Sequence, residues 1–80
     1  MISGNDLKCL RKASGIKLED VFEVARISVS ILNYIENDEL EKLPPQIYLK
    51  NFLKSYAEIL HLDSEKIVDG YIINLSLMQR

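Results

Sequence analysis

One stretch, residues 43–63 with the sequence LPPQIYLKNFLKSYAEILHLD, constrains the fold more than any other part of the chain. Pro44 and Pro45 lack backbone N–H groups and have a preset φ, so they suit a loop exit and a first helical turn rather than a helix interior. After them, apolar residues recur at spacings of three and four, which at about 100° per residue places them on one broad arc. The pattern predicts a helix over residues 45–61 whose arc holds Tyr48, Leu49, Phe52, Leu53, Tyr56, Ile59 and Leu60.

This arc is wide enough for two roles. Its centre should be buried, because Tyr56 lies between Leu49 and Phe52 on the helical wheel. Its edge can present aromatic rings to a protein partner, since tyrosine is favoured where one end of a side chain is apolar and the other is wet. The alternative is that every aromatic residue on the arc belongs to the core. The candidate partner-binding residues are Tyr48, Phe52 and Ser55, with a polar rim of Lys50, Asn51 and Lys54.

Length and composition limit the chain to one small domain. With 80 residues, 48% of them hydrophobic and 28% charged, it can bury one core and does not resemble a disordered tail. No run approaches the roughly 18 apolar residues of a membrane span. The opening MISGNDLK lacks a basic region followed by an apolar run, so we expect a cytoplasmic protein whose lone Cys9 is a partly exposed thiol without chemistry.

Shorter helices are expected around the long one. Asn5 or Asp6 can cap the first helix, Gly15 suits the position just past its end, and Ser28 can cap a third helix. A helix, a tight turn and a second short helix is the spacing of a helix-turn-helix. The sequence therefore predicts an all-α fold, a compact five-helix bundle containing a helix-turn-helix, as a single domain over residues 1–80 with helices at 5–14, 18–26, 29–36, 45–61 and 64–77.

An acidic segment, ENDELEKLPP at residues 36–45, joins the third and fourth expected helices. Its acids, Glu36, Asp38, Glu39 and Glu41, lack the loop glycine and alternating spacing of an EF-hand, so a solvated loop is a better interpretation than a cation site. Leu40 and Leu43 can anchor this loop to the core. The core itself should contain Leu18, Val21, Leu32, Ile35, Leu49, Leu53, Tyr56 and Leu60.

Catalytic and metal chemistry have no candidate constellation in the sequence. His61 has neither a second histidine nor a suitably spaced cysteine, so we do not expect it to hold a metal. No nucleophile, base and orienting acid can be assembled, and no glycine-rich phosphate loop is present. We therefore expect neither an enzyme nor a bound cofactor.

Two sets of residues carry a resemblance to a known family. They are Leu7, Arg11, Gly15, Leu18, Val21, Ile27, Ser28, Leu32, Ile35 and Glu36, and more specifically Leu43, Pro44, Tyr48, Phe52, Ser55, Tyr56, Ala57, Leu60, Leu62 and Asp63. Over nearly its whole length the chain resembles the cytoplasmic helix-turn-helix domain of RodZ-type bacterial proteins, a relative of the Xre/Cro repressor fold. Phe22 departs from the family pattern, which prefers a small alanine inside the turn.

The resemblance implies both an architecture and a partner. It implies a five-helix bundle forming the N-terminal part of a longer protein with a transmembrane segment, so that the domain would lie at the inner face of the bacterial membrane. It also implies a role in bacterial cell-shape control through an actin-like filament protein of the MreB type. The family's contacting aromatic positions fall on Tyr48 and Phe52 in the fourth helix.

A helix-turn-helix also suggests the alternative of an Xre-type, sequence-specific DNA-binding regulator, and charge argues against it. Duplex affinity depends on Lys and Arg that neutralise phosphates, whereas residues 18–43 contain seven acids and two bases, a balance of about −5. The candidate residues for a DNA-binding surface are Ser28, Ser30, Asn33 and Arg11. On the third helix only Asn33 has a side chain well suited to hydrogen-bond a base edge. Residues 29–33 also lack the basic residues sometimes seen in the family. The remaining argument for DNA is the group of bases Lys8, Arg11, Lys12 and Lys17.

Overall fold

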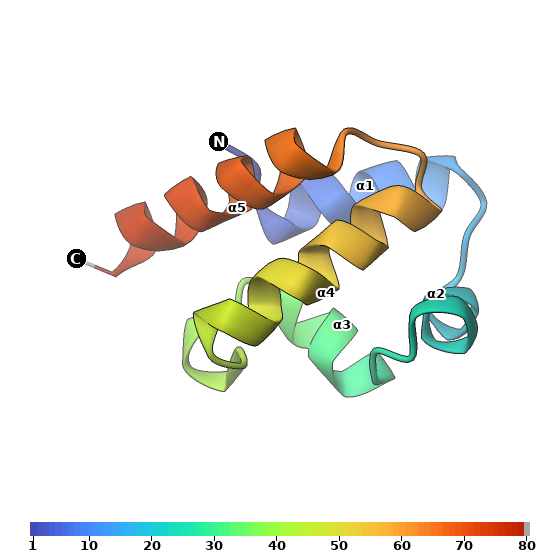
Figure 1. Cartoon of the computed structure of the whole chain (residues 1–80), viewed down its shortest axis with the longest axis horizontal. Coiled ribbons are helices and arrows are strands. Elements are labelled where there is room, and N and C mark those ends of the chain that lie inside the picture. The colour runs from blue at the N-terminus through green and yellow to red at the C-terminus, as the bar shows by residue number, and fades with distance from the viewer. Residues whose placement is uncertain (80) are drawn as a thin grey trace.

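The computed structural model describes residues 1–79, and all of their regular structure is helical (Figure 1). The predicted all-α class and five-helix architecture are confirmed. A short 3-10 helix, η1, lies within the acidic segment between the third and fourth α-helices. The elements in order are α1 (Gly4–Ala13), α2 (Leu18–Ala25), α3 (Val29–Glu36), η1 (Leu40–Lys42), α4 (Gln46–Ile59) and α5 (Ser64–Met78).

The long helix α4 lies in the middle of the bundle (Figure 1). It packs along α5, which runs in the opposite direction because only residues 60–63 connect the two helices. Helix α1 packs on α3, and α2 packs on both α3 and α4. The helix-turn-helix pair α2 and α3 is thus joined to the rest of the bundle by α1, which packs on α3, and by α4, which packs on α2.

Short polar residues set the helix ends. Ser3 caps α1, in place of the predicted Asn5 or Asp6, because its hydroxyl accepts the Asp6 N–H at 3.1 Å while the Asp6 carboxylate accepts the Ser3 N–H at 3.0 Å. This reciprocal capping box satisfies two donors that a helix start otherwise leaves free. Ser28 caps α3 as predicted. Gly15 follows α1 with a φ of 72°, a left-handed conformation that glycine adopts without strain.

One hydrophobic core lies between the five helices, and α4 supplies much of it. Leu18 is the one predicted core residue that is only half-buried, because it starts α2 at the edge of the bundle. The core also contains buried residues outside the predicted set, such as Leu7 on α1 and Tyr71 on α5. The buried hydrophobic residues are Leu7, Val21, Ile27, Leu32, Ile35, Leu49, Leu53, Tyr56, Ala57, Leu60, Ile67, Tyr71 and Leu75.

Two glycines allow the N-terminal segment to pack closely on the bundle. A Cβ at Gly4 would lie within 2.7 Å of the Glu36 carbonyl group, so α1 and α3 can cross here only without a side chain. Gly70 faces Ile2, whose backbone N–H donates to the Gly70 carbonyl at 3.0 Å. The glycine that weakens α5 by up to about 1 kcal/mol in helix propensity therefore makes room for the start of the chain.

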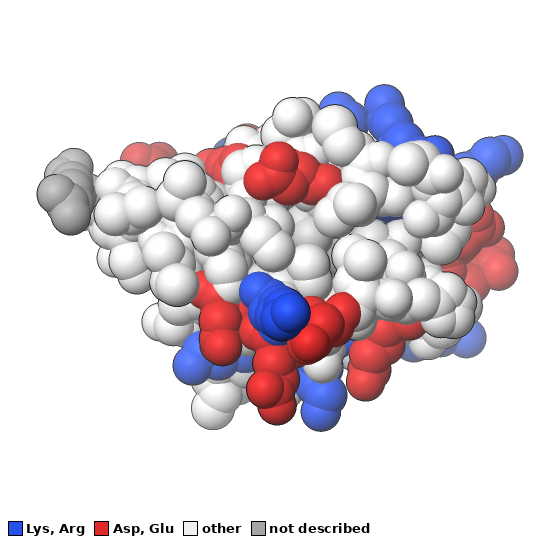
Figure 2. Space-filling view, turned by 90° about the horizontal axis from the view of Figure 1, so that it is seen from above, with Lys and Arg blue, Asp and Glu red and all other residues white. Residues whose placement is uncertain are grey.

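Charge is distributed unevenly along α5. The helix carries Glu65, Lys66 and Asp69 in its first half and no charged residue from Gly70 to Gln79. The space-filling view shows the resulting uncharged surface at the left end of the molecule (Figure 2). Within residues 1–79, no helix combines the length and the apolarity needed to cross a bilayer.

The burial pattern predicts opposite outcomes for two aliphatic residues of α4. Leu53→Ala should lower the free energy of unfolding by about 2–5 kcal/mol, because Leu53 is fully buried and its truncation leaves a cavity. Ile47→Ala is the matched control, since Ile47 is 71% exposed, and should change stability by about 0.5 kcal/mol or less. Urea titrations of both variants measure the difference, and equal losses would contradict the packing described here.

Candidate functional site

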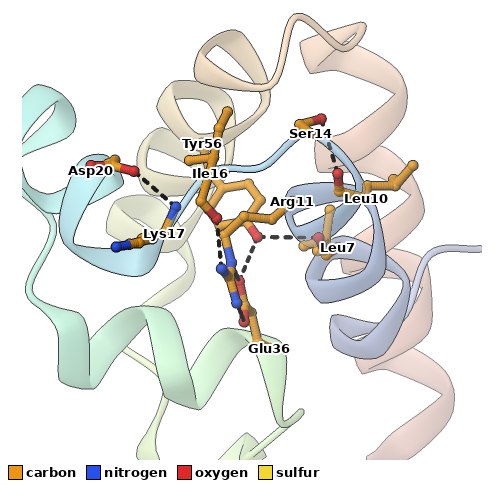
Figure 3. A network of polar contacts seen from close by, with 9 residues as sticks. All are labelled: Leu7, Leu10, Arg11, Ser14, Ile16, Lys17, Asp20, Glu36 and Tyr56. Atoms are coloured by element: carbon orange, nitrogen blue, oxygen red, sulfur yellow. Dashed lines mark hydrogen bonds and ion pairs between the residues drawn. The ribbon is translucent and has the colours of Figure 1, made fainter.

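A buried polar network joins α1, α3 and α4 (Figure 3). Arg11 on α1 is only 6% exposed. Its guanidinium donates two hydrogen bonds to the Glu36 carboxylate at the end of α3, from Nε to Oε2 at 2.7 Å and from Nη2 to Oε1 at 3.0 Å. The Tyr56 hydroxyl of α4 donates to the same Oε2 at 2.5 Å. The remaining guanidinium arm donates to the Ile16 carbonyl at 2.8 Å. This bidentate geometry is the strong and directional form of an arginine–carboxylate ion pair.

The network also fixes the protonation of its members. The hydrogen bond to Glu36 raises the pKa of Arg11, so the guanidinium stays charged. Burial raises the pKa of the Tyr56 hydroxyl, and the neighbouring Glu36 carboxylate raises it further, so this phenol stays neutral and acts as a donor. The charged Arg11–Glu36 pair and the neutral Tyr56 hydroxyl together hold α1, α3 and α4 in contact.

A second, partly buried set of contacts connects the acidic segment to α1 and α5. The Asp38 carboxylate accepts the Gly4 N–H at 2.9 Å and the Asn74 side-chain amide at 3.2 Å. Tyr71 on α5 donates its hydroxyl to the Ile35 carbonyl at 2.8 Å, and burial together with the Asp38 charge raises the pKa of Tyr71.

These contacts correct two interpretations made from the sequence. Arg11 is not available as a DNA contact, because its guanidinium is buried and fully engaged. Glu36 does not belong to a solvated acidic loop, and Asp38 is half-buried. Helical spacing could have indicated that Arg11 and Glu36 are buried. Arg11 follows Leu7 by four residues and Glu36 follows Leu32 by four, so each charged residue shares a helix face with a core leucine.

The predicted partner-binding residues lie on two different flanks of α4. Tyr48 is 58% exposed and shares the flank toward α2 with the half-buried Phe52 and Ser55. Lys50 and Lys54, with Asn51, are exposed and line a shallow hollow against α5. The structure therefore brings the aromatic pair and the serine together, but the lysines do not form a rim around them. About 160° of helical rotation separates Lys50 from Tyr48, which explains the difference.

The candidate DNA-reading face on α3 is small and nearly uncharged. Ser30 and Asn33 are exposed, whereas the Ser28 hydroxyl is engaged as the helix cap. Arg26, in the turn before α3, has a φ of 60° and places its guanidinium 5.9 Å from the centre of the Phe22 ring. Phe22 is thus turned outward and covered by a cation, which accommodates a large residue next to the turn.

Two exposed apolar residues were missed by the sequence reasoning. Ile47 on α4 and Val24 on α2 are 71% and 72% exposed. Both lie off the apolar arc of their helix, which is the signal that could have identified them.

Within residues 1–79, no group of three or more His, Cys, Asp or Glu side chains is arranged to hold a metal ion.

The fold and its surface define an all-α helix-turn-helix domain in which a long fourth helix exposes a tyrosine. A family model described as a helix-turn-helix domain matches residues 6–67, so the chain belongs to that family. The chain is 31% identical, over 85% of its length, to the cytoskeleton protein RodZ of Streptococcus pneumoniae. It is also 37% identical, over 74% of its length, to an uncharacterized protein of Haemophilus influenzae. The predicted RodZ type of the domain is confirmed.

The chain is short compared with these relatives. It spans 25% of the Streptococcus pneumoniae protein and 20% of the Haemophilus influenzae protein. No solved structure matches the chain.

The buried network predicts a large effect of one conservative substitution. Glu36→Gln keeps the shape of the side chain but leaves the Arg11 charge buried without its counter-ion, so it should destabilise the domain by about 3–5 kcal/mol. Glu39→Gln is the matched control, because Glu39 only forms a solvent-exposed pair with Lys42 at 3.3 Å, and it should cost about 1 kcal/mol or less. Denaturant titrations compare the two. A similar small loss in both variants would show that the network does not stabilise the fold.

The raised pKa values of Tyr56 and Tyr71 predict a loss of stability at alkaline pH. Below about pH 10 both tyrosines are neutral in the folded and the unfolded chain, and their contribution is complete. Above it the unfolded chain releases the protons and the folded chain retains them, so the free energy of unfolding should fall by about 1.4 kcal/mol per pH unit for each tyrosine. Denaturant titrations between pH 8 and pH 11 measure the slope.

Phenylalanine variants identify the groups responsible for this slope. Tyr56→Phe and Tyr71→Phe should each remove about half of the alkaline fall, because each deletes one titrating hydroxyl. A slope that persists in the double variant would assign the effect to other groups.

Proposed function

We propose that this RodZ-type domain is a non-catalytic docking module that binds an actin-like filament protein of the MreB type in bacterial cell-shape control. The family match and the similarity to a relative named as a cytoskeleton protein support a binding role. The observation that carries the choice of surface is Tyr48, an aromatic side chain left 58% exposed on the central helix. In this proposal the domain is the N-terminal part of a longer protein and lies in the cytoplasm at the inner face of the membrane.

The packing of α4 suits a docking role. Leu49 and Leu53 are buried beside Tyr48 and Phe52, so the helix backbone is held in place before any partner arrives. A rigid helix loses little conformational entropy on binding, which leaves more of the contact energy as affinity. Tyrosine is also among the residues most often found as binding hot spots.

The DNA-binding alternative has less support. Arg11 is buried in the ion pair and is therefore withdrawn from the surface, whereas Arg26 stays exposed with its guanidinium 5.9 Å from the centre of the Phe22 ring. The surface between residues 18 and 43 keeps its excess of acids, which repel phosphates.

Alanine substitutions on α4 test the proposal. Tyr48→Ala should weaken binding to a purified MreB-type subunit by about 1–3 kcal/mol, the range of an aromatic anchor, and leave folding intact because the ring is exposed. Phe52→Ala should weaken binding similarly but also lower stability, since Phe52 packs against the core. Lys54→Ala should have a milder effect that depends on salt, because Lys54 lies on the flank toward α5 and acts through its charge rather than by contact. Calorimetric titration measures the affinities, and circular dichroism checks that each variant is folded.

Two controls separate this surface from the others. Ile47→Ala removes an apolar side chain that is even more exposed than Tyr48 from a different face of α4, and it should leave the affinity unchanged. Asn33→Ala tests the face of α3. If Tyr48→Ala binds like the wild type while Asn33→Ala abolishes binding, the interface is not on α4.

A further inference from the structure

An open hollow of about 340 Å³ lies between α2 and α4. Val24 and Ala25 of α2 form one wall, and Ser55, Glu58 and Ile59 of α4 form the other. Val24 is 72% exposed, so a β-branched apolar side chain stands in water at the edge of the hollow. Exposure of this kind costs free energy that a contact with another apolar group would recover.

The hollow continues the flank of α4 that carries Tyr48. Ser55 follows Tyr48 by seven residues, and Ile59 follows Phe52 by seven, so each pair lies along one line of the helix at a spacing of about 10 Å. One partner surface lying along this flank would therefore reach the hollow after covering Tyr48. The flank and the hollow form one continuous surface that passes from α4 onto α2.

Acids outnumber bases around the hollow, although Arg26 follows Ala25 and Lys54 precedes Glu58 by one helical turn. Glu58 lines it, Glu23 is exposed next to Val24, and Asp20 precedes Val24 by one helical turn. The side chains that line the hollow, all within the described part of the chain, include no Lys or Arg. An approaching group is favoured here if it carries positive charge.

The size of the hollow distinguishes between kinds of occupant. Pockets for small molecules usually enclose about 300–1,000 Å³ and surround most of the ligand. This hollow is at the lower limit of that range, is open to solvent and is lined by only five residues. It is suited to one side chain of a protein that covers it from outside.

We propose that the hollow is a second contact site for the filament subunit, receiving an apolar side chain that is flanked by Lys or Arg on the partner. This inference rests on the proposed function, and it extends the binding surface from α4 to α2. Val24 supplies the apolar contact, and Glu58 supplies the charge that selects a basic neighbour.

The test uses the 80-residue chain and a purified MreB-type subunit in calorimetric titrations at several salt concentrations. Val24→Ser should weaken binding by about fivefold or more, which corresponds to the loss of an interface residue worth about 1 kcal/mol. Ile47→Ser is the matched control, because it makes the same type of change at a residue of equal exposure outside the hollow, and it should bind like the wild type. Glu58→Gln should make the affinity less dependent on salt, whereas Glu65→Gln, an exposed acid on α5, should not.

The outcomes separate the two proposals. If Tyr48→Ala weakens binding while Val24→Ser and Glu58→Gln behave like the wild type, the docking function stands and the contact at the hollow is overturned. If the wild-type chain does not bind the filament subunit, the proposed function and this inference are both overturned. Weakening by Val24→Ser and by Tyr48→Ala, with both controls unchanged, supports a surface that spans α2 and α4.

Discussion

The ion pair between Arg11 and Glu36 is the interaction on which the arrangement of the helix-turn-helix depends. It links α1 to the end of α3, and the Tyr56 hydroxyl joins α4 to the same carboxylate (Figure 3). Charges removed from water are tolerated only when they are closely paired and their remaining hydrogen-bonding groups are satisfied. Among the described residues no buried side-chain nitrogen or oxygen lacks a partner, so the three helices can meet in only a narrow range of positions.

The burial of this ion pair determines which charged side chains remain on the surface of the helix-turn-helix. Arg11 could have neutralised a phosphate, but its guanidinium holds α1 to α3 in the interior. The exposed polar face of α3 consists of Ser30 and Asn33. The opposite situation holds on α4, where the core occupies one face and Tyr48 remains exposed on another. Because affinity for duplex DNA comes mainly from exposed cations, the burial of Arg11 agrees with the proposal that the partner is a protein.

Local rules account for much of what could be predicted. The proline pair and the spacing of apolar residues predicted the long helix and the burial of Leu53 and Tyr56, because these signals depend only on backbone sterics and helical periodicity. Ser28 was recognised as a cap for the same reason. Ser3 was missed, since Asn5 and Asp6 are equally good capping residues and only the actual start of α1 distinguishes them. Periodicity predicts Leu18 in the core, although its position at the start of α2 leaves it half-buried.

The sequence by itself determined the class of fold, the identity of the central helix and the face of that helix which enters the core. Only the tertiary structure decided that Arg11 and Glu36 meet in the interior, that Lys50 and Lys54 lie across the helix from Tyr48, and that Val24 stands beside a hollow. The physical reason is that periodicity describes the angle of a residue around its own helix. Whether a charged side chain is solvated or paired, and whether an apolar one is covered or exposed, depends on which other helix lies opposite, and that is settled by long-range packing.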